Sequence, residues 1–366
     1  MLRLLIIAVL VFAAACSDRQ VTPRFHASQN PQLLSEWGAI AVEGEILALG
    51  RGVTPYALNT PLFTDYAHKL RTVWTMGDAS PYQEQDVFAL PVGTVITKTF
   101  YYPTSGDSVL QAEDLESVNG ANPLDLSRHR LIETRLLVRR DDGWHPLSYI
   151  WNEAQTDAVL KRTGAVIPLT LVAEDGGERS FAYVVPNKNQ CAACHATNAT
   201  TKEISPIGPS AGQLNRFYWY AEGERNQLLA WAERGLIERP VSVPIRQVSW
   251  MDPEASLDAR ARSYLAANCA HCHNPKGPAD TSGLDLTLSA TPLALGRCKL
   301  PIAAGSGTGG HRYDIVPGAP QESILVYRTA SSDPGAMMPE LGRSLVHDEG
   351  VALLSEWISA MEGSCS

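Results

Sequence analysis

The 366-residue sequence lacks several features that mark common classes of protein. It has no run rich in Lys and Arg and a formal net charge of −9, so it lacks the clustered positive charge that a nucleic-acid surface needs. It has no low-complexity segment. Its N-terminal apolar run, Leu4 to Phe12, is shorter than the about 20 residues that span a bilayer. The hydrophobic fraction of 45% indicates a folded protein, long enough for two domains of ordinary size.

The first residues, MLRLLIIAVLVFAAACSDRQ, are typical of an export signal, which we place at residues 1–15. Ala13-Ala14-Ala15-Cys16 resembles the lipobox of bacterial lipoproteins, although Ala13 stands where leucine is usual. This resemblance implies a lipid anchor on Cys16, and Ser17 after it implies the periplasmic side of the outer membrane. Cleavage at the alanine run, which would leave a soluble periplasmic protein, stays open as the alternative.

Seven cysteines can be assigned almost without remainder in an oxidising compartment. Four belong to two C-x-x-C-H motifs. Cys298 and Cys365 are the pair left downstream of these motifs, so we predict a disulfide between them. Cys16 is then the odd cysteine, and lipidation would account for it.

The two motifs are Cys191-Ala-Ala-Cys194-His195 and Cys269-Ala-His-Cys272-His273. Such a motif attaches haem because its two thiols can each form a thioether with a vinyl group, while the adjacent His reaches the iron. A structural zinc site built from two C-x-x-C pairs is the main alternative. Export and an intact His after both pairs favour haem. The sequence therefore predicts two covalently bound haem c groups.

Alternation of apolar and polar residues predicts an antiparallel sheet before the first motif, and helical patterns follow it. We expect an anchor and linker over 16–55, a β-rich haem domain with a helical tail over 56–250, and a helical domain over 251–366. The predicted strands are Leu58 to Trp74, Thr94 to Tyr102, Leu131 to Arg139, Trp144 to Trp151, Val166 to Val172 and Ser180 to Val185. The predicted helices are Glu222 to Gly235, Ala255 to Cys269, opened by Asp252-Pro253, and Asp348 to Met361.

The region after residue 251 resembles a class I cytochrome c domain. A helix leads into the second motif, Met337-Met338-Pro339 follows, and an amphipathic helix ends the chain. The resemblance implies that the first and last helices pack together, with His273 as proximal and Met338 as distal iron ligand. The expected fold class is therefore α+β: an N-terminal antiparallel β-rich haem domain followed by an all-α class I cytochrome c domain.

The first motif has no such ligand set, because neither Met nor His occurs between His195 and Met251. Met251 stands where a linker is expected. Gly208-Pro209-Ser210 resembles the class I segment whose proline carbonyl orients the proximal His, which implies that role for Pro209 toward His195. The β-rich part distantly resembles the sheet cytochromes of the P460 and c′-beta group, which have an open iron face. We expect no strong distal ligand, and the remaining candidates are His68, Met76, His129 and His145.

The whole chain resembles a family of exported di-haem c-type cytochromes of unassigned function, often encoded beside a parallel β-helix protein. The residues that carry this resemblance are Leu58 to Phe63, Gln190 to His195, Asn268 to His273 and Met337 to Arg343. It implies redox protein partners, with the β-helix protein among the candidates. We expect single-electron transfer, with a haem enzyme, such as a peroxidase or a P460-like oxidase, as the alternative and a gas-binding protein as a third.

Overall fold

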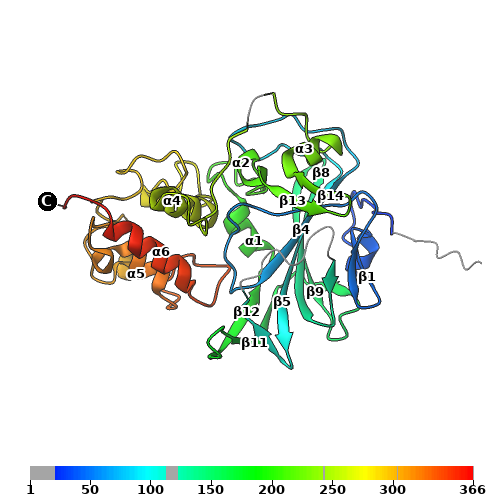
Figure 1. Cartoon of the computed structure of the whole chain (residues 1–366), viewed down its shortest axis with the longest axis horizontal. Coiled ribbons are helices and arrows are strands. Elements are labelled where there is room, and N and C mark those ends of the chain that lie inside the picture. Colours follow the sequence, from blue (N-terminus) through cyan, green and yellow to red (C-terminus); the bar gives the residue numbers. More distant parts are fainter. Residues whose placement is uncertain (1–20, 113–122, 242–243, 303, 366) are drawn as a thin grey trace, which may run out of the picture.

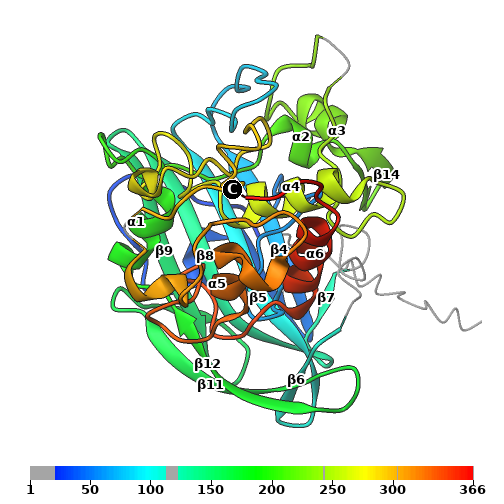
Figure 2. The same ribbon diagram turned by 90° about the vertical axis from the view of Figure 1, so that its left-hand side faces the viewer.

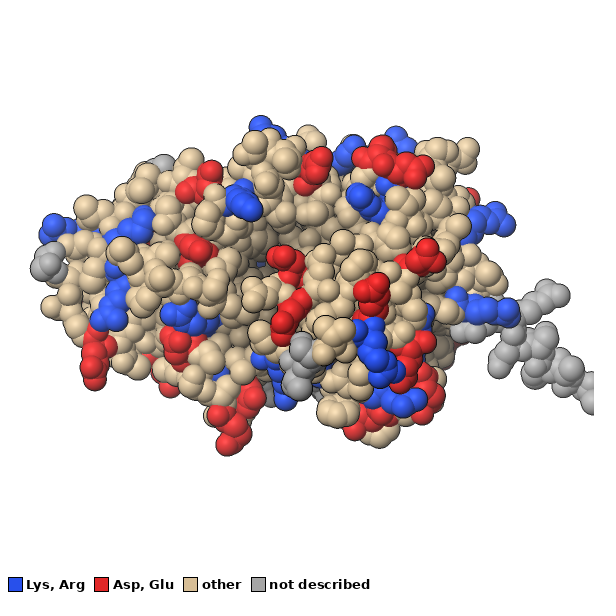
Figure 3. All heavy atoms as spheres, turned by 90° about the horizontal axis from the view of Figure 1, so that it is seen from above, with Lys and Arg blue, Asp and Glu red and all other residues tan. Residues whose placement is uncertain are grey.

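The computed structural model describes residues 21–112, 123–241, 244–302 and 304–365, so the expected signal peptide and Cys16 lie outside the described residues. The chain is mixed α+β with a β-rich N-terminal region, and its last third is helical (Figure 1). Among the described helices, none combines the length and apolar character needed to cross a membrane. Acidic and basic side chains are interspersed over the face shown in Figure 3.

Residues from 21 on, which the sequence assigned to an anchor and linker, are part of the β-rich fold. A 3-10 helix, η1 (Leu34–Trp37), precedes a small sheet in the order β1 (Ile40–Glu43), β2 (Ile46–Leu49) and β7 (Leu124–Asp125). The side chain of Trp37 is buried in the main core, and its indole donates a hydrogen bond to the Tyr149 hydroxyl at 2.8 Å.

Most predicted strands are confirmed within one large, mainly antiparallel sheet. Its order is β10-β9-β8-β5-β6-β11-β12, β4 pairs with β5 and β3 with β4, and the short β6–β11 pairing is parallel. The strands are β3 (Thr54–Tyr56), β4 (His68–Thr75), β5 (Thr94–Ser105), β6 (Ser108–Leu110), β8 (His129–Arg140), β9 (Gly143–Trp151), β10 (Ala158–Leu160), β11 (Ala165–Val172) and β12 (Glu178–Val185).

The predicted strand from Leu58 to Trp74 is wrong in its first half, because β4 begins only at His68. Asp65 and Tyr66 have φ angles of 46° and 62°, in the left-handed region that an extended strand cannot contain. The chain therefore turns before β4. Residues 58–67 run along the boundary with the helical part instead.

The segment after the first motif is also less helical than predicted. α1 (Lys188–His195) carries the motif, and α2 (Ala211–Leu214) follows. The predicted helix from Glu222 to Gly235 is confirmed only in its second half, as α3 (Gln227–Glu233). Its first half is the strand β14 (Gly223–Asn226), which forms a hairpin with β13 (Phe217–Tyr220). Asn226 ends the strand and caps α3, because its side chain accepts hydrogen bonds from Leu228 N and Leu229 N.

The helical part has its own core, built from residues 250 onward. It contains α4 (Leu257–Asn268), α5 (Ile324–Ala330) and α6 (Asp348–Ser359), with short 3-10 turns η2 (Asp280–Ser282), η3 (Gly305–Thr308) and η4 (Pro320–Glu322). The N-cap of α4 is Ser256, whose hydroxyl accepts from Ala259 N at 3.2 Å, so Asp252-Pro253 does not open the helix as predicted.

The first and last helices of this part pack against each other, as the sequence predicts. A Cβ atom at Gly350 of α6 would collide with the Tyr264 hydroxyl of α4, so the absence of a side chain permits this close approach. The Trp357 indole donates to the Asp258 carboxylate at 2.9 Å. The predicted disulfide between Cys298 and Cys365 is confirmed.

The helical part lies in front of the sheet, in contact with residues 62–66 (Figure 2). The Asp65 carboxylate accepts from the backbone N–H groups of Ser344 and Leu345, both at 2.7 Å. Burial raises the pKa of Asp65 to about 6, although the two N–H donors act to lower it. Phe63 N donates to Asn268 Oδ1 at 2.8 Å.

An aromatic cluster completes this interface around His347. Its ring stacks on Phe63 at 4.1 Å between centroids, and its Nδ1 lies 2.9 Å from the Tyr264 hydroxyl. Tyr66 and Trp250 meet it edge-on. Burial, helped by the nearby Lys69 charge, lowers the pKa of His347 from 6.5 to about 3.

His347→Gln should make the protein less sensitive to mild acid. As the pH falls from 7 to 5, the unfolded chain protonates this ring while the folded chain keeps it neutral, so the free energy of unfolding should fall by about 2 kcal/mol through His347. Glutamine can still accept from Tyr264 but does not titrate. Urea unfolding at both pH values measures the difference, with His311→Gln, at a half-exposed histidine that packs edge-on against Tyr327, as control. Equal pH dependence in wild type and His347→Gln would contradict the prediction.

Candidate functional site

The two C-x-x-C-H motifs meet at one cavity between the β-rich and helical parts, here called the central cavity. Its cavity volume is about 100 Å³. Cys191, Cys194 and His195 line it from the first motif, and Cys269 and His271 from the second. The volume is below the about 300–1,000 Å³ of typical ligand sites.

The first motif occupies α1, whose start is set by a capping box. The Asn187 side chain accepts from Asn189 N and Gln190 N, while the Gln190 side chain accepts from Asn187 N at 2.9 Å. This places both cysteines and His195 within two turns of helix at the sheet edge. α1 contacts β9, and the cavity lies beside it.

The orientation of His195 is set by a backbone carbonyl, but not by that of Pro209. His195 Nδ1 donates to Ser205 O at 2.8 Å, whereas Pro209 O accepts from Phe88 N. The role implied for Pro209 is therefore wrong. With Nδ1 protonated, Nε2 keeps the lone pair that a metal would take. Burial and then the Lys98 charge lower the pKa of His195 to about 4, which favours the neutral ring.

The second motif follows α4, and its His273 has the same tautomer as His195, with the proton on Nδ1. Ser282 Oγ donates its one proton to Ala279 O at 2.7 Å, so it accepts from His273 Nδ1 at 3.0 Å. His273 Nε2 is thus also left as an acceptor. Cys269 lines the central cavity, while Cys272 and His273 are not among the described residues that line it.

The two motifs contact each other directly. Cys272 Sγ lies 3.8 Å from Ala193 O, and Ala199 N donates to Lys276 O at 2.7 Å. The close approach of the two thiols lowers the pKa of Cys194 and raises that of Cys272. The four motif cysteines form no disulfide. Segments about 78 residues apart in the sequence are therefore neighbours in the fold, which sequence reasoning did not anticipate.

Met338 reaches the same cavity from a loop held by Arg343. The guanidinium donates to Met338 O from Nη2 at 2.9 Å and from Nε at 3.1 Å, and to Ser331 O at 2.8 Å. Met338 lines the cavity, while Met337 is buried elsewhere in the protein, with 7% of its surface exposed. The predicted preference for Met338 over Met337 agrees with this placement.

The sheet wall of the cavity carries two cations that the sequence analysis missed, Lys98 and Arg135. Burial and the neighbouring Arg135 and Arg71 charges lower the pKa of Lys98 to about 7. The period-2 pattern could have found Lys98, because it shares a sheet face with the buried Ile96 and Phe100.

None of the candidate distal donors named from the sequence is among the described residues that line the cavity. Met76 is 65% exposed, and the His145 ring pairs with Asp142 at 2.7 Å. His129 Nδ1 lies 2.7 Å from Asp125 O, and His68 packs beside Tyr101. Met251, expected in a linker, is 46% exposed just before α4.

The motif side chains at the cavity are of the kinds that a covalently attached haem would use, thiols and an imidazole with Nε2 free. In the described part of the chain, no three His, Cys, Asp or Glu side chains gather closely enough to hold a bare metal ion. Haem iron needs only one or two protein ligands because the macrocycle supplies four. The buried Nδ1 of His271 also has no hydrogen-bond partner among the described residues, as expected where a bound group would lie beside it.

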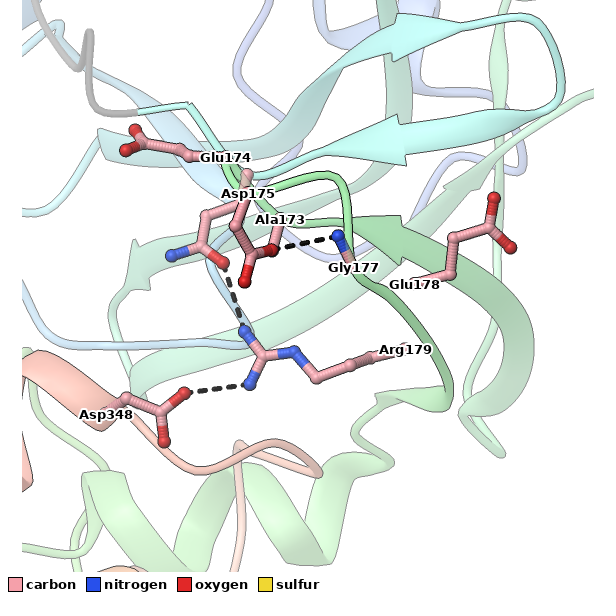
Figure 4. A pocket seen from close by; sticks show the side chains of 8 residues that line it. Ala173, Glu174, Asp175, Gly177, Glu178, Arg179 and Asp348 are labelled. Carbon is pink, nitrogen blue, oxygen red and sulfur yellow. Dashed lines mark hydrogen bonds and ion pairs between the residues drawn. The ribbon is translucent and has the colours of Figure 1, made fainter.

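A separate hollow lies where β12 meets α6 (Figure 4). Arg179 donates there to Asp348 at 2.9 Å and to Gln111 at 3.0 Å, and the Glu174–Glu178 turn borders it. It contains no residue of either motif. Because Arg179 is bound on both sides, its evident role is to fasten the sheet to α6.

Comparison with known proteins adds no relative. No family model, no curated protein and no solved structure matches the chain. The functional assignment therefore depends on the motifs and their geometry.

Proposed function

We propose that this chain is a di-haem c-type cytochrome that transfers single electrons. One haem is attached through Cys191 and Cys194 with His195 on its iron, and the other through Cys269 and Cys272 with His273 and Met338. The observation that carries the proposal is the direct contact of the two motifs at one cavity. Two groups attached there would lie within a short distance of each other, as efficient electron transfer between them requires.

The residues of the chain prepare both sites for iron. Ser205 O and Ser282 Oγ hold the two imidazoles in the tautomer that leaves Nε2 free. Arg343 positions the Met338 loop, and a thioether ligand raises the reduction potential relative to nitrogen ligands. Haem itself supplies the one-electron iron couple. The packing of α4 against α6 and the position of Met338 support a class I cytochrome c domain over 251–366.

The alternative is a haem enzyme, a peroxidase or a P460-like oxidase, that uses an open first haem. One observation favours it: the sheet wall beside the first motif offers Lys98 and Arg135 but no Met or His side chain among the described residues. Electron transfer remains our preferred function, because the two motifs are in contact and the sequence supplies both a His and a Met for the second iron.

Export and anchoring complete the proposal. The apolar N-terminal run and the lipobox-like Ala13 to Cys16 support a lipoprotein on the periplasmic side of the outer membrane, with a soluble periplasmic protein as the alternative. Partners would be redox proteins, the parallel β-helix protein among them. The net charge of −9 would favour a basic docking patch on such a partner.

Replacing Cys191 and Cys194 together by Ala should lower the covalent haem content from two to one per chain. Thioether-bound haem survives denaturing electrophoresis, so haem staining and the mass of the denatured protein measure it. The matched control is the double change of Cys298 and Cys365, which also removes two cysteines but should keep both haems. Unchanged haem content in the first variant, or stoichiometric zinc in the wild type, would refute the assignment.

Met338→Ala should abolish the weak sulfur-to-iron absorption at the red end of the oxidised spectrum, because it removes the thioether that faces the cavity. Met337→Ala is the matched control and should keep the band. Both variants should retain two covalent haems, so the comparison isolates the axial ligand. A band that persists in Met338→Ala would show that another residue ligates the second iron.

A further inference from the structure

A row of three cationic side chains crosses the face of the main sheet beside the central cavity. Arg71 of β4 is paired in register with Lys98 of β5, and Lys98 with Arg135 of β8. We call these three residues the cation row. Like charges directly opposite each other on neighbouring strands destabilise a sheet, so such a row calls for negative charge nearby.

Glu133 supplies part of that charge, but its oxygens are already engaged. They accept hydrogen bonds from Arg135, with Nε at 2.9 Å, and from the Tyr183 hydroxyl at 2.8 Å. Arg71 donates to a neutral group, the Lys69 carbonyl, at 3.3 Å. This carboxylate thus lies near two cations of the row, Lys98 and Arg135, and is bound to Arg135.

Lys98 is the member of the row with the least compensation. Its ammonium has no hydrogen-bond partner among the described residues and lies 5.3 Å from the centre of the Phe100 ring. Its neighbours on the same strand face, Ile96 and Phe100, belong to two apolar clusters. Burying a cation between two apolar clusters costs free energy unless an anion pairs with it, whereas water compensates an exposed cation.

Lys98 and Arg135 line the cavity together with Cys191, Cys194 and His195. A ligand beside the first motif would therefore meet positive charge on the sheet wall. A small anion could bind the metal and form an ion pair with Lys98 at the same time. A neutral ligand could bind the metal but would form no ion pair.

We propose that Lys98, supported by Arg135, binds a small monovalent anion of the azide or nitrite class at the first haem site. This inference rests on the proposed haem attachment at Cys191 and Cys194. It gives the first site a ligand class, which Lys98 and Arg135 would select by charge.

Azide titration of the oxidised full-length protein, followed by absorption, tests the proposal. Wild type should show a saturable change at one haem, and Lys98→Met should bind azide about tenfold or more weakly, the loss expected for a charge-assisted contact. Lys98→Gln provides a second neutral variant, and Lys98→Arg should restore most of the affinity. Lys188→Met, on the exposed side of α1, is the matched control. Imidazole, a neutral ligand, should bind all variants similarly.

Equal azide affinity in wild type, Lys98→Met and Lys98→Gln would overturn the proposal and show that another anion, such as a haem carboxylate, neutralises Lys98. A wild type with two haems that does not respond to azide would also overturn it. Covalent haem content, measured on the same samples, separates these results from failure of the proposed function. Absence of covalent haem at Cys191 and Cys194 would refute the proposed function itself.

Discussion

The contact of residues 62–66 with the helical part is the interaction on which the site depends. The Asp65 carboxylate binds two backbone N–H groups in the segment before α6, and Phe63 binds Asn268 at the end of α4. The second motif begins one residue after Asn268. These bonds therefore hold the second motif against the first, and without them the cavity would have no helical wall.

The contact of residues 62–66 with the helical part also explains why no regular strand follows Tyr56 until β4 begins at His68. A strand over 58–67 would satisfy its backbone within the sheet but leave the helical part unattached. The left-handed conformations of Asp65 and Tyr66 turn the chain outward, and Asp65 compensates by binding two N–H groups across the boundary. The hydrogen bonds between the two parts thus offset the free-energy cost of the left-handed backbone conformations at Asp65 and Tyr66.

Much of the fold could be predicted from the sequence, because its strands alternate clearly and its last helix has a continuous apolar stripe. The Cys298–Cys365 disulfide was predicted by elimination among the seven cysteines, and the packing of α4 with α6 was implied by the resemblance to class I cytochrome c. The turn at Asp65 and Tyr66 could not be, since neither residue is a glycine. The hairpin at Phe217 to Asn226 was missed although Gly223, with a φ of 115°, stands at its turn and could have signalled it.

The candidate site was predicted residue by residue but not as an arrangement. The cysteines and histidines were predicted from the two C-x-x-C-H motifs, and Met338 from the Met-Pro step that follows the second motif. The Ser205 carbonyl in place of Pro209, and the cation Lys98, come from the tertiary fold. What sequence reasoning could not supply was the contact between the motifs, which would decide whether two haems attached there act separately or as a pair.

That pairing is the central claim, and electron paramagnetic resonance of the fully oxidised protein tests it most directly. The spectrum of the wild type is compared with the sum of spectra from two single-haem variants, one lacking Cys191 and Cys194 and the other lacking Cys269 and Cys272. Two haems attached to contacting turns should interact magnetically, so the wild-type spectrum should differ from the sum. A wild-type spectrum equal to the sum would mean that the two irons are magnetically isolated, and would contradict the account.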